Sequence, residues 1–137
     1  MKVLQTSVLV LTLGLLVSLW GTTFAQEEVP QDTVVVAEVD EFTALIQKSE
    51  TLHDQKKYNE TFEVLKEAEK LNPEDPELLW RLARAHFDIA DQSDDEAVHK
   101  EHFYPGLDYA KRAVKLDPNS AKAHKWYAIL IGKIGLM

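Results

Sequence analysis

The stretch from Asp75 to Ile89, DPELLWRLARAHFDI, decides the fold because it carries a complete helix signal. Asp75 is a favourable N-cap residue, and Pro76 suits the first helical position. Mostly apolar side chains then recur at helical spacing: Leu79, Leu82, Ala83, His86 and Ile89. This pattern predicts a helix with one buried stripe, against which the other segments pack.

A helical hairpin is predicted upstream, between residues 41 and 71. Its first helix has an apolar face and is followed by a polar turn at residues 54–57. Its second helix ends at Asn72-Pro73. The faces predicted to pack are Leu45, Ile46, Ser49 and Leu52 in the first helix, and Tyr58, Phe62, Leu65, Ala68 and Leu71 in the second.

The spacing of equivalent positions indicates tetratricopeptide-like repeats. Leu79-x2-Leu82-Ala83-x2-His86 has the spacing of the first-helix signature of that repeat, and Leu45 precedes Leu79 by the repeat period of 34 residues. His124 follows Leu79 by 45 residues, and Pro118 follows Pro73 by the same interval. The second repeat therefore holds an insertion, predicted at about residues 91–101.

Two local signals shape the rest of the array. Ser93 to Glu96 reads as a capping box and predicts that the next helix begins after Ser93, whereas Pro105-Gly106 predicts a kink or break near Tyr104. A last helix follows Ser120. Its apolar end predicts self-association or contact with further repeats. We therefore expect an all-α α-solenoid fragment of two hairpins plus one helix over residues 41–137.

The N-terminal segment has the layout of a secretory signal peptide. Lys2 precedes an apolar run, and Thr23-Phe24-Ala25 places small residues at a cleavage position, so residues 1–25 are a signal peptide or an uncleaved signal anchor. Residues 26–40 form an acidic, flexible spacer. The charge pattern predicts an extracytoplasmic body, secreted, periplasmic or anchored by this segment, rather than a cytosolic one.

Composition excludes several functions. The chain has 23 acidic and 15 basic side chains, which disfavours nucleic acid and anionic membrane surfaces as partners. It has no cysteine and no nucleophile motif, so we expect neither an enzyme nor a cofactor. His99 and His102 lack a third ligand at suitable spacing and are interpreted as part of an exposed polar face rather than a metal site.

Three residues are candidates for binding a protein or peptide partner. Trp80 and Lys125 each follow a packing position by one residue, at the edge of first helices that faces the concave groove in tetratricopeptide arrays. With Arg84 one turn on from Trp80, they would line a groove suited to an extended or acidic peptide. Packing of Trp80 between repeats is the alternative. Arg81 is expected to point outward or to pair with Glu77.

Three segments, LLWRLARA (78–85), YAKRAV (109–114) and HKWYAI (124–129), together with the long insertion, resemble the regulator of microtubule dynamics family. The resemblance implies an all-α, tetratricopeptide-like protein that binds protein partners, with microtubule regulation or organelle tethering as themes. We therefore expect a non-catalytic scaffold or adaptor, exported or membrane-anchored. The alternatives are a cytosol-facing regulator of this family and a truncated fragment of a longer repeat protein.

Overall fold

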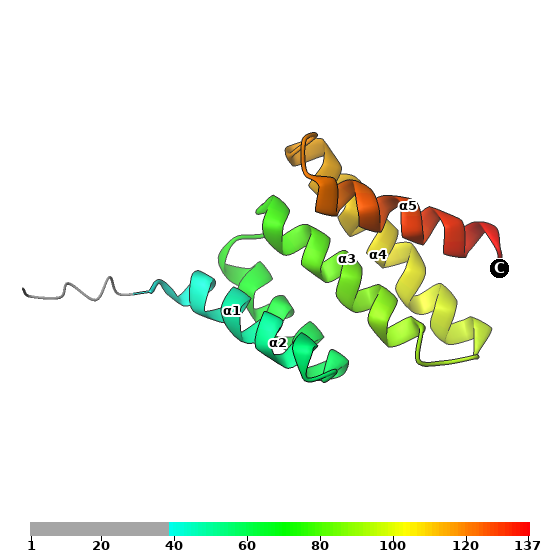
Figure 1. Ribbon diagram of the computed structural model, residues 1–137, viewed down its shortest axis with the longest axis horizontal. Helices are drawn as coiled ribbons and strands as arrows, with labels where there is room; N and C mark the ends of the chain where they lie inside the picture. The colour runs from blue at the N-terminus through cyan, green and yellow to red at the C-terminus, as the bar shows by residue number, and fades with distance from the viewer. Residues whose placement is uncertain (1–38) are drawn as a thin grey trace, which may run out of the picture. The chain divides into compact units, whose positions relative to one another are not determined.

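The computed structural model describes residues 39–137 and consists there of helices without strands, which confirms the all-α prediction. The predicted signal peptide lies outside the described residues, and so does the predicted spacer apart from its last two positions. The helices, in the order of Figure 1, are α1 (Glu41–Asp54), α2 (Tyr58–Leu71), α3 (Pro76–Ala90), α4 (Glu96–Leu116) and α5 (Ala121–Gly135).

Helix α3 is the centre of this body. It packs against α2, α4 and α5, while α1 pairs with α2 and α4 pairs with α5 (Figure 1). Every residue from Leu78 to His86 is buried, including Arg81 and Arg84. The predicted single buried stripe is therefore wrong: a helix with neighbours on several sides loses its solvent-exposed face.

Side-chain caps set where α3 and α5 begin. The Asp75 carboxylate accepts a hydrogen bond from the Leu78 N–H at 2.8 Å, and Pro76 occupies the first turn, as the sequence predicts. The Ser120 hydroxyl accepts from the Ala123 N–H at 3.2 Å. Each cap satisfies a backbone donor that the first helical turn leaves without a partner.

The start of α4 differs from the predicted capping box. Ser93 Oγ accepts a hydrogen bond from the Asp95 N–H at 3.1 Å, which closes a short turn before the helix. Asp95 is the N-cap instead, since its carboxylate accepts from the Ala97 N–H at 2.8 Å. The prediction failed because a serine can hold a local turn as readily as it caps a helix.

Of the kink or break predicted near Tyr104, the break is wrong, because α4 runs through Pro105 without ending; the kink stays a prediction. An internal proline removes one helical hydrogen bond and costs about 3 kcal/mol in an isolated helix. Here Phe103 and Ala110 are buried in the same cluster as Leu130, and Gly106 is buried with them. Packing on α3 and α5 outweighs the local cost.

A histidine pair joins α3 to α4. Nδ1 of buried His86 lies 3.1 Å from Nδ1 of His102, and the His86 ring stacks on Tyr109 with centroids 5.6 Å apart. The expectation that His102 belongs to an exposed polar face is therefore wrong. Burial, followed by the charges of His102 and Lys66, lowers the pKa of His86 to about 4.

The close approach of α4 to α3 predicts opposite effects at two glycines. A Cβ on Gly106 would lie 3.0 Å from His86 Cβ and 3.4 Å from the Ala83 carbonyl oxygen, whereas one on Gly132 would meet no atom within 4 Å. We expect Gly106→Ala to lower the free energy of unfolding by about 1–2 kcal/mol after its gain in helix propensity. Gly132→Ala should raise it by up to about 1 kcal/mol. Urea unfolding followed by circular dichroism measures both, and equal shifts would contradict the packing argument.

The histidine pair predicts acid sensitivity. Because the pKa of His86 is depressed from its ordinary 6.5 to about 4 in the folded chain, its contribution to stability is fully present above pH 6.5 and is lost as the pH falls toward 4. We expect the difference in unfolding free energy between the wild type and His86→Leu to shrink by about 2–3 kcal/mol across that range. A difference that stays constant from pH 7 to pH 4 would show that His86 does not titrate in this way.

Candidate functional site

A groove of about 510 Å³ lies where α1, α3 and α5 approach one another, with one residue from the start of α2. Its walls combine aromatic rings with charged groups. Glu50 and His53 come from α1, Tyr58 from α2, Trp80, Arg84 and Asp88 from α3, and Lys122, Lys125 and Trp126 from α5.

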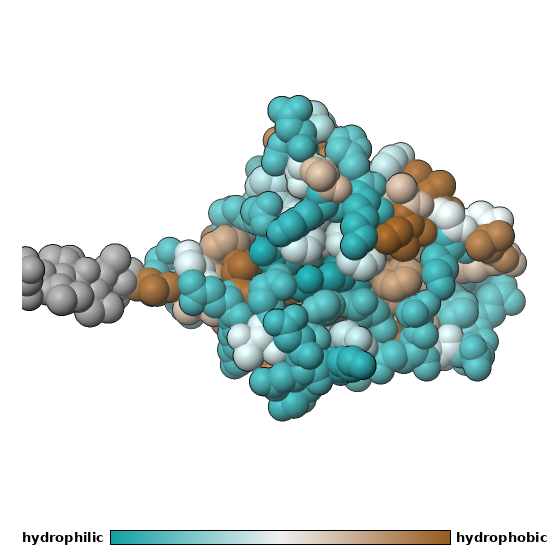
Figure 2. Space-filling view, viewed as in Figure 1, coloured by the Kyte–Doolittle hydropathy of each residue, from teal (hydrophilic) through white to brown (hydrophobic). Residues whose placement is uncertain are grey.

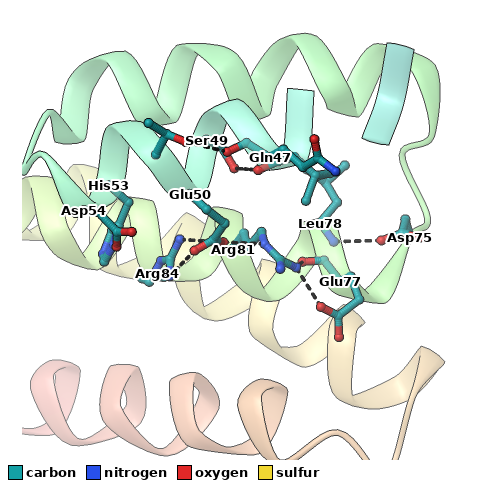
Figure 3. Close-up of polar contacts among 12 residues, drawn as sticks. Gln47, Ser49, Glu50, His53, Asp54, Asp75, Glu77, Leu78, Arg81 and Arg84 are labelled. Carbon is teal, nitrogen blue, oxygen red and sulfur yellow. Dashed lines mark hydrogen bonds and ion pairs between the residues drawn. The ribbon is translucent and has the colours of Figure 1, made fainter. Parts of the chain in front are cut away.

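The wall formed by α1 and α3 is held by one shared carboxylate. Glu50 Oε1 accepts a hydrogen bond from Arg81 Nε at 2.6 Å and from an Arg84 terminal nitrogen at 3.0 Å (Figure 3). Arg81 also donates to the carboxylate and the carbonyl of Glu77, both at 2.7 Å. Both guanidinium groups are therefore fixed in place before any ligand binds.

Two opposing effects set the pKa of Glu50: burial and the contact with the arginines. Partial burial acts to raise the pKa of Glu50, but the hydrogen bonds and charges of Arg84 and Arg81 together outweigh it and hold the pKa below its ordinary value of 4.5. The carboxylate is therefore charged near neutral pH, which the two buried arginines require.

A second polar contact joins the same two helices further along the groove. His53 Nε2 lies 3.2 Å from Asp88 Oδ2. Burial raises the pKa of Asp88, although the neighbouring His53 and Arg84 oppose this shift. Helix α1 thus contacts α3 at two places within this wall, through Glu50 and through His53.

Trp80 forms part of the groove but is almost completely covered, with 3% of its surface exposed. Cations surround its ring: Arg81 Cζ lies 4.1 Å from the ring centroid, Lys122 Nζ 4.8 Å and Arg84 Cζ 5.3 Å. Among the described residues, neither its indole N–H nor Arg84 Nε has a hydrogen-bond acceptor. The groove therefore contains two buried donors that are not satisfied internally, and Asp88 Oδ2 is a buried acceptor there that likewise receives no hydrogen bond from the described residues.

The α5 wall is different, because its charges are not matched. Within residues 39–137, Lys122 and Lys125 form no ion pair, although Lys125 Nζ lies 5.3 Å from the Trp126 ring centroid. Both lysines are exposed. One wall is thus internally neutralised and fixed, and the other presents free ammonium groups.

The three residues singled out in the sequence, Trp80, Arg84 and Lys125, all line this groove. The alternative given for Trp80 holds, since its ring is packed in a buried cluster with Ala113 of α4 and Ala123 of α5. Arg81 pairs with Glu77, as one of its two expected placements has it, and does not point outward, because it is buried and also binds Glu50. Sequence reasoning did not find Lys122 and Trp126, although Lys122 lies one turn before Lys125 on the same helix face.

Among residues 39–137 there is neither a metal-binding cluster nor a membrane-spanning helix. No group of three or more His, Asp or Glu side chains there is arranged to hold a metal ion. Nor does any of the five helices combine the length and apolar character needed to cross a bilayer. Hydrophobic residues gather over α5 on an otherwise largely hydrophilic face (Figure 2). Ile131 of α5 is 45% exposed, and Leu136, which follows the helix, is 88% exposed.

Fold and groove together define an all-α protein whose central helix carries one wall of a charged groove. A family model described as Regulator of microtubule dynamics protein 1-3 matches residues 45–137, a span that includes most of α1 and all of α2 to α5. The chain belongs to this family, as its three segments and long insertion suggested.

Individual relatives agree. The chain is 38% identical over 100 residues to regulator of microtubule dynamics protein 1 of Bos taurus, covering 72% of this chain and 31% of the relative. It is 56% identical over 63 residues to the Mus musculus protein 1, covering 45% and 21%. With the Xenopus laevis protein 3 it shares 34% identity over 105 residues, covering 74% and 23%. The chain thus spans about a fifth to a third of these relatives. No solved structure matches.

The shared carboxylate predicts a large cost on its removal. Glu50→Ala leaves two buried guanidinium groups without their common partner, and we expect the free energy of unfolding to fall by about 2 kcal/mol, less than for a fully buried pair because Glu50 retains some solvent contact. Glu67→Ala is the matched control, since Glu67 pairs with Lys70 on an exposed helix face. Its cost should be below about 0.5 kcal/mol. Equal losses in urea unfolding would show that Glu50 is only a surface charge.

Proposed function

We propose that this chain is a non-catalytic, protein-binding part of a regulator of microtubule dynamics, acting as an adaptor whose groove receives a protein partner. The observation that carries the proposal is the groove itself, which has one fixed wall and one wall of free cations and lies within the family match. The relatives are named for regulating microtubule dynamics, so a microtubule or a microtubule-associated protein is the first partner to test.

The arrangement of helices supports a tetratricopeptide-like reading of the fold. Helices α1 and α2, and then α3 and α4, pair as successive hairpins, and α5 packs on the second pair. The groove is lined mainly by the first helix of each predicted repeat, α1, α3 and α5, which is how such arrays present their concave surface. Leu45 and Leu79, one repeat period apart in sequence, both lie near the start of their helices, α1 and α3, with a difference of one residue in register.

The apolar edge of α5 supports a second kind of contact. Ile131 and Leu136 are exposed, and Gly132 has open space around its Cα. Exposed apolar side chains such as these gain free energy when another helix covers them. We propose that further helices of a longer protein, or a second copy of the chain, pack there.

The helical part of the chain has two candidate locations, the cytosol and the far side of a membrane. Family membership favours a body that faces the cytosol, where the microtubules of the relatives' names are found. The specific observation that favours the other is the N-terminal pattern, since Lys2, the apolar run and Ala25 are typical of export. In that case the same groove would serve an extracytoplasmic partner.

One pair of measurements separates the two candidates. We expect the full chain, expressed in cells, to be digested by protease added to the cytosolic side of the membranes. We expect the purified chain to sediment with polymerised microtubules. Protease protection combined with N-terminal mass analysis would instead reveal an exported form, which would be protected and would begin at Gln26. That outcome, together with no co-sedimentation, would remove the microtubule role and leave an exported binding module.

A further inference from the structure

Charge is distributed very unevenly along the described residues. Residues 39–102 carry 17 acidic and 8 basic side chains, whereas residues 103–137 carry 2 acidic and 6 basic ones. Helix α5 contains no acidic residue at all. Its groove-facing lysines therefore have no partner on their own helix, in a chain that is otherwise strongly acidic.

The two free lysines lie at a spacing that a ligand can match. Lys122 and Lys125 are three residues apart on α5, so they lie on one face with Cβ atoms about 5–6 Å apart. Side chains at alternate positions of an extended peptide lie about 6.6 Å apart on one face. Two carboxylates of an extended acidic segment can therefore reach both ammonium groups at once.

The opposite wall supplies two carboxylates and further donors. Glu50 is engaged by Arg81 and Arg84, so its charge is already matched, and Asp88 faces His53 of the same wall. The unsatisfied donors, the Trp80 indole N–H and Arg84 Nε, lie in side chains of this wall. The lining as a whole sets the cations of Arg84, Lys122 and Lys125 against these two carboxylates, and an acidic peptide would balance the excess positive charge of the two lysines.

We propose that the groove recognises an extended acidic peptide segment, with carboxylates at alternate positions bound by Lys122 and Lys125. The inference rests on the proposed function of the groove as a protein-binding site and adds the chemistry of its partner. A peptide is favoured over an anionic membrane because the lysines line a concave groove, and because acidic residues of α1 to α4 would be driven toward the membrane around it.

The test uses the full chain and a defined probe. A fluorescein-labelled peptide of eight glutamates is titrated by fluorescence anisotropy beside an equally long glutamine peptide. We expect the glutamate peptide to bind at least about tenfold more tightly, with an affinity that falls as salt is raised. Trp80 and Trp126 line the groove, so tryptophan fluorescence should change with the same midpoint.

Charge reversal locates the binding. Lys122→Glu with Lys125→Glu should weaken the glutamate peptide by at least about tenfold, and an acidic residue in the first turn of α5 is favourable for the helix. Lys48→Glu with Lys115→Glu is the matched control, since neither lysine lines the groove and neither forms an ion pair within residues 39–137. It should bind nearly as the wild type does. Lys122→Gln with Lys125→Gln provides a milder variant if the reversal impairs folding.

Three results would overturn the proposal. They are equal affinity for the glutamate and glutamine peptides, equal weakening by the control pair, and lysine-dependent binding to phosphatidylserine vesicles without binding to the peptide.

The probe contains no tubulin, so failure of microtubule co-sedimentation with intact peptide binding would remove only the microtubule role. Co-sedimentation without peptide binding would remove only the chemistry proposed for the groove.

Discussion

The contact of Glu50 with Arg81 and Arg84 is the constraint on which the rest of the structure depends. Both arginines lie on the central helix and are buried, so their charges need partners; Glu77 on the same helix meets part of the need of Arg81, and the rest comes from a neighbouring helix. Glu50 supplies that charge from α1 and thereby fixes the first hairpin against α3. The same contact builds one wall of the groove, because Arg81 covers the ring of Trp80. Fold and candidate site therefore share their central interaction.

The two walls of the groove serve different purposes. The α1 and α3 wall is neutralised internally, so binding need not reorganise it, and fixed groups of this kind lower the entropic cost of association. The α5 wall carries free lysines on one edge and exposed apolar residues on another. Helix α5 thus belongs to the core through Ala123 and Leu130, packs partly against it through Trp126, Tyr127 and Ile134, and faces the surface with its lysines and Ile131. The family match extends over it to residue 137.

The sequence predicted those parts of the fold that depend on local chemistry. Asp75 and Pro76 set the start of α3. Trp80 and Lys125 line the groove as predicted, but the reasoning holds only for Trp80: Leu79 before it is buried, whereas His124, the packing position assumed before Lys125, is exposed and Ala123 is buried instead. Contacts between distant segments were not predictable in this way. Glu50 lies 31 residues from Arg81, and His86 pairs with His102 across two helices. Ser93 and Pro105 misled because each has a local signal that tertiary packing or an alternative turn overrides. The predicted export signal and acidic spacer stay predictions.

The separation of acidic and basic residues along the chain affects how the molecule rotates as it approaches a charged partner. A body with excess negative charge in α1 to α3 and excess positive charge from the later part of α4 through α5 carries a permanent electric dipole. In the field of an anionic polymer it experiences a torque that turns α5 toward the polymer. Diffusional encounters would then be oriented in favour of one end of the molecule. This alignment fades where the Debye length, about 8 Å at physiological ionic strength, becomes short compared with the approach distance.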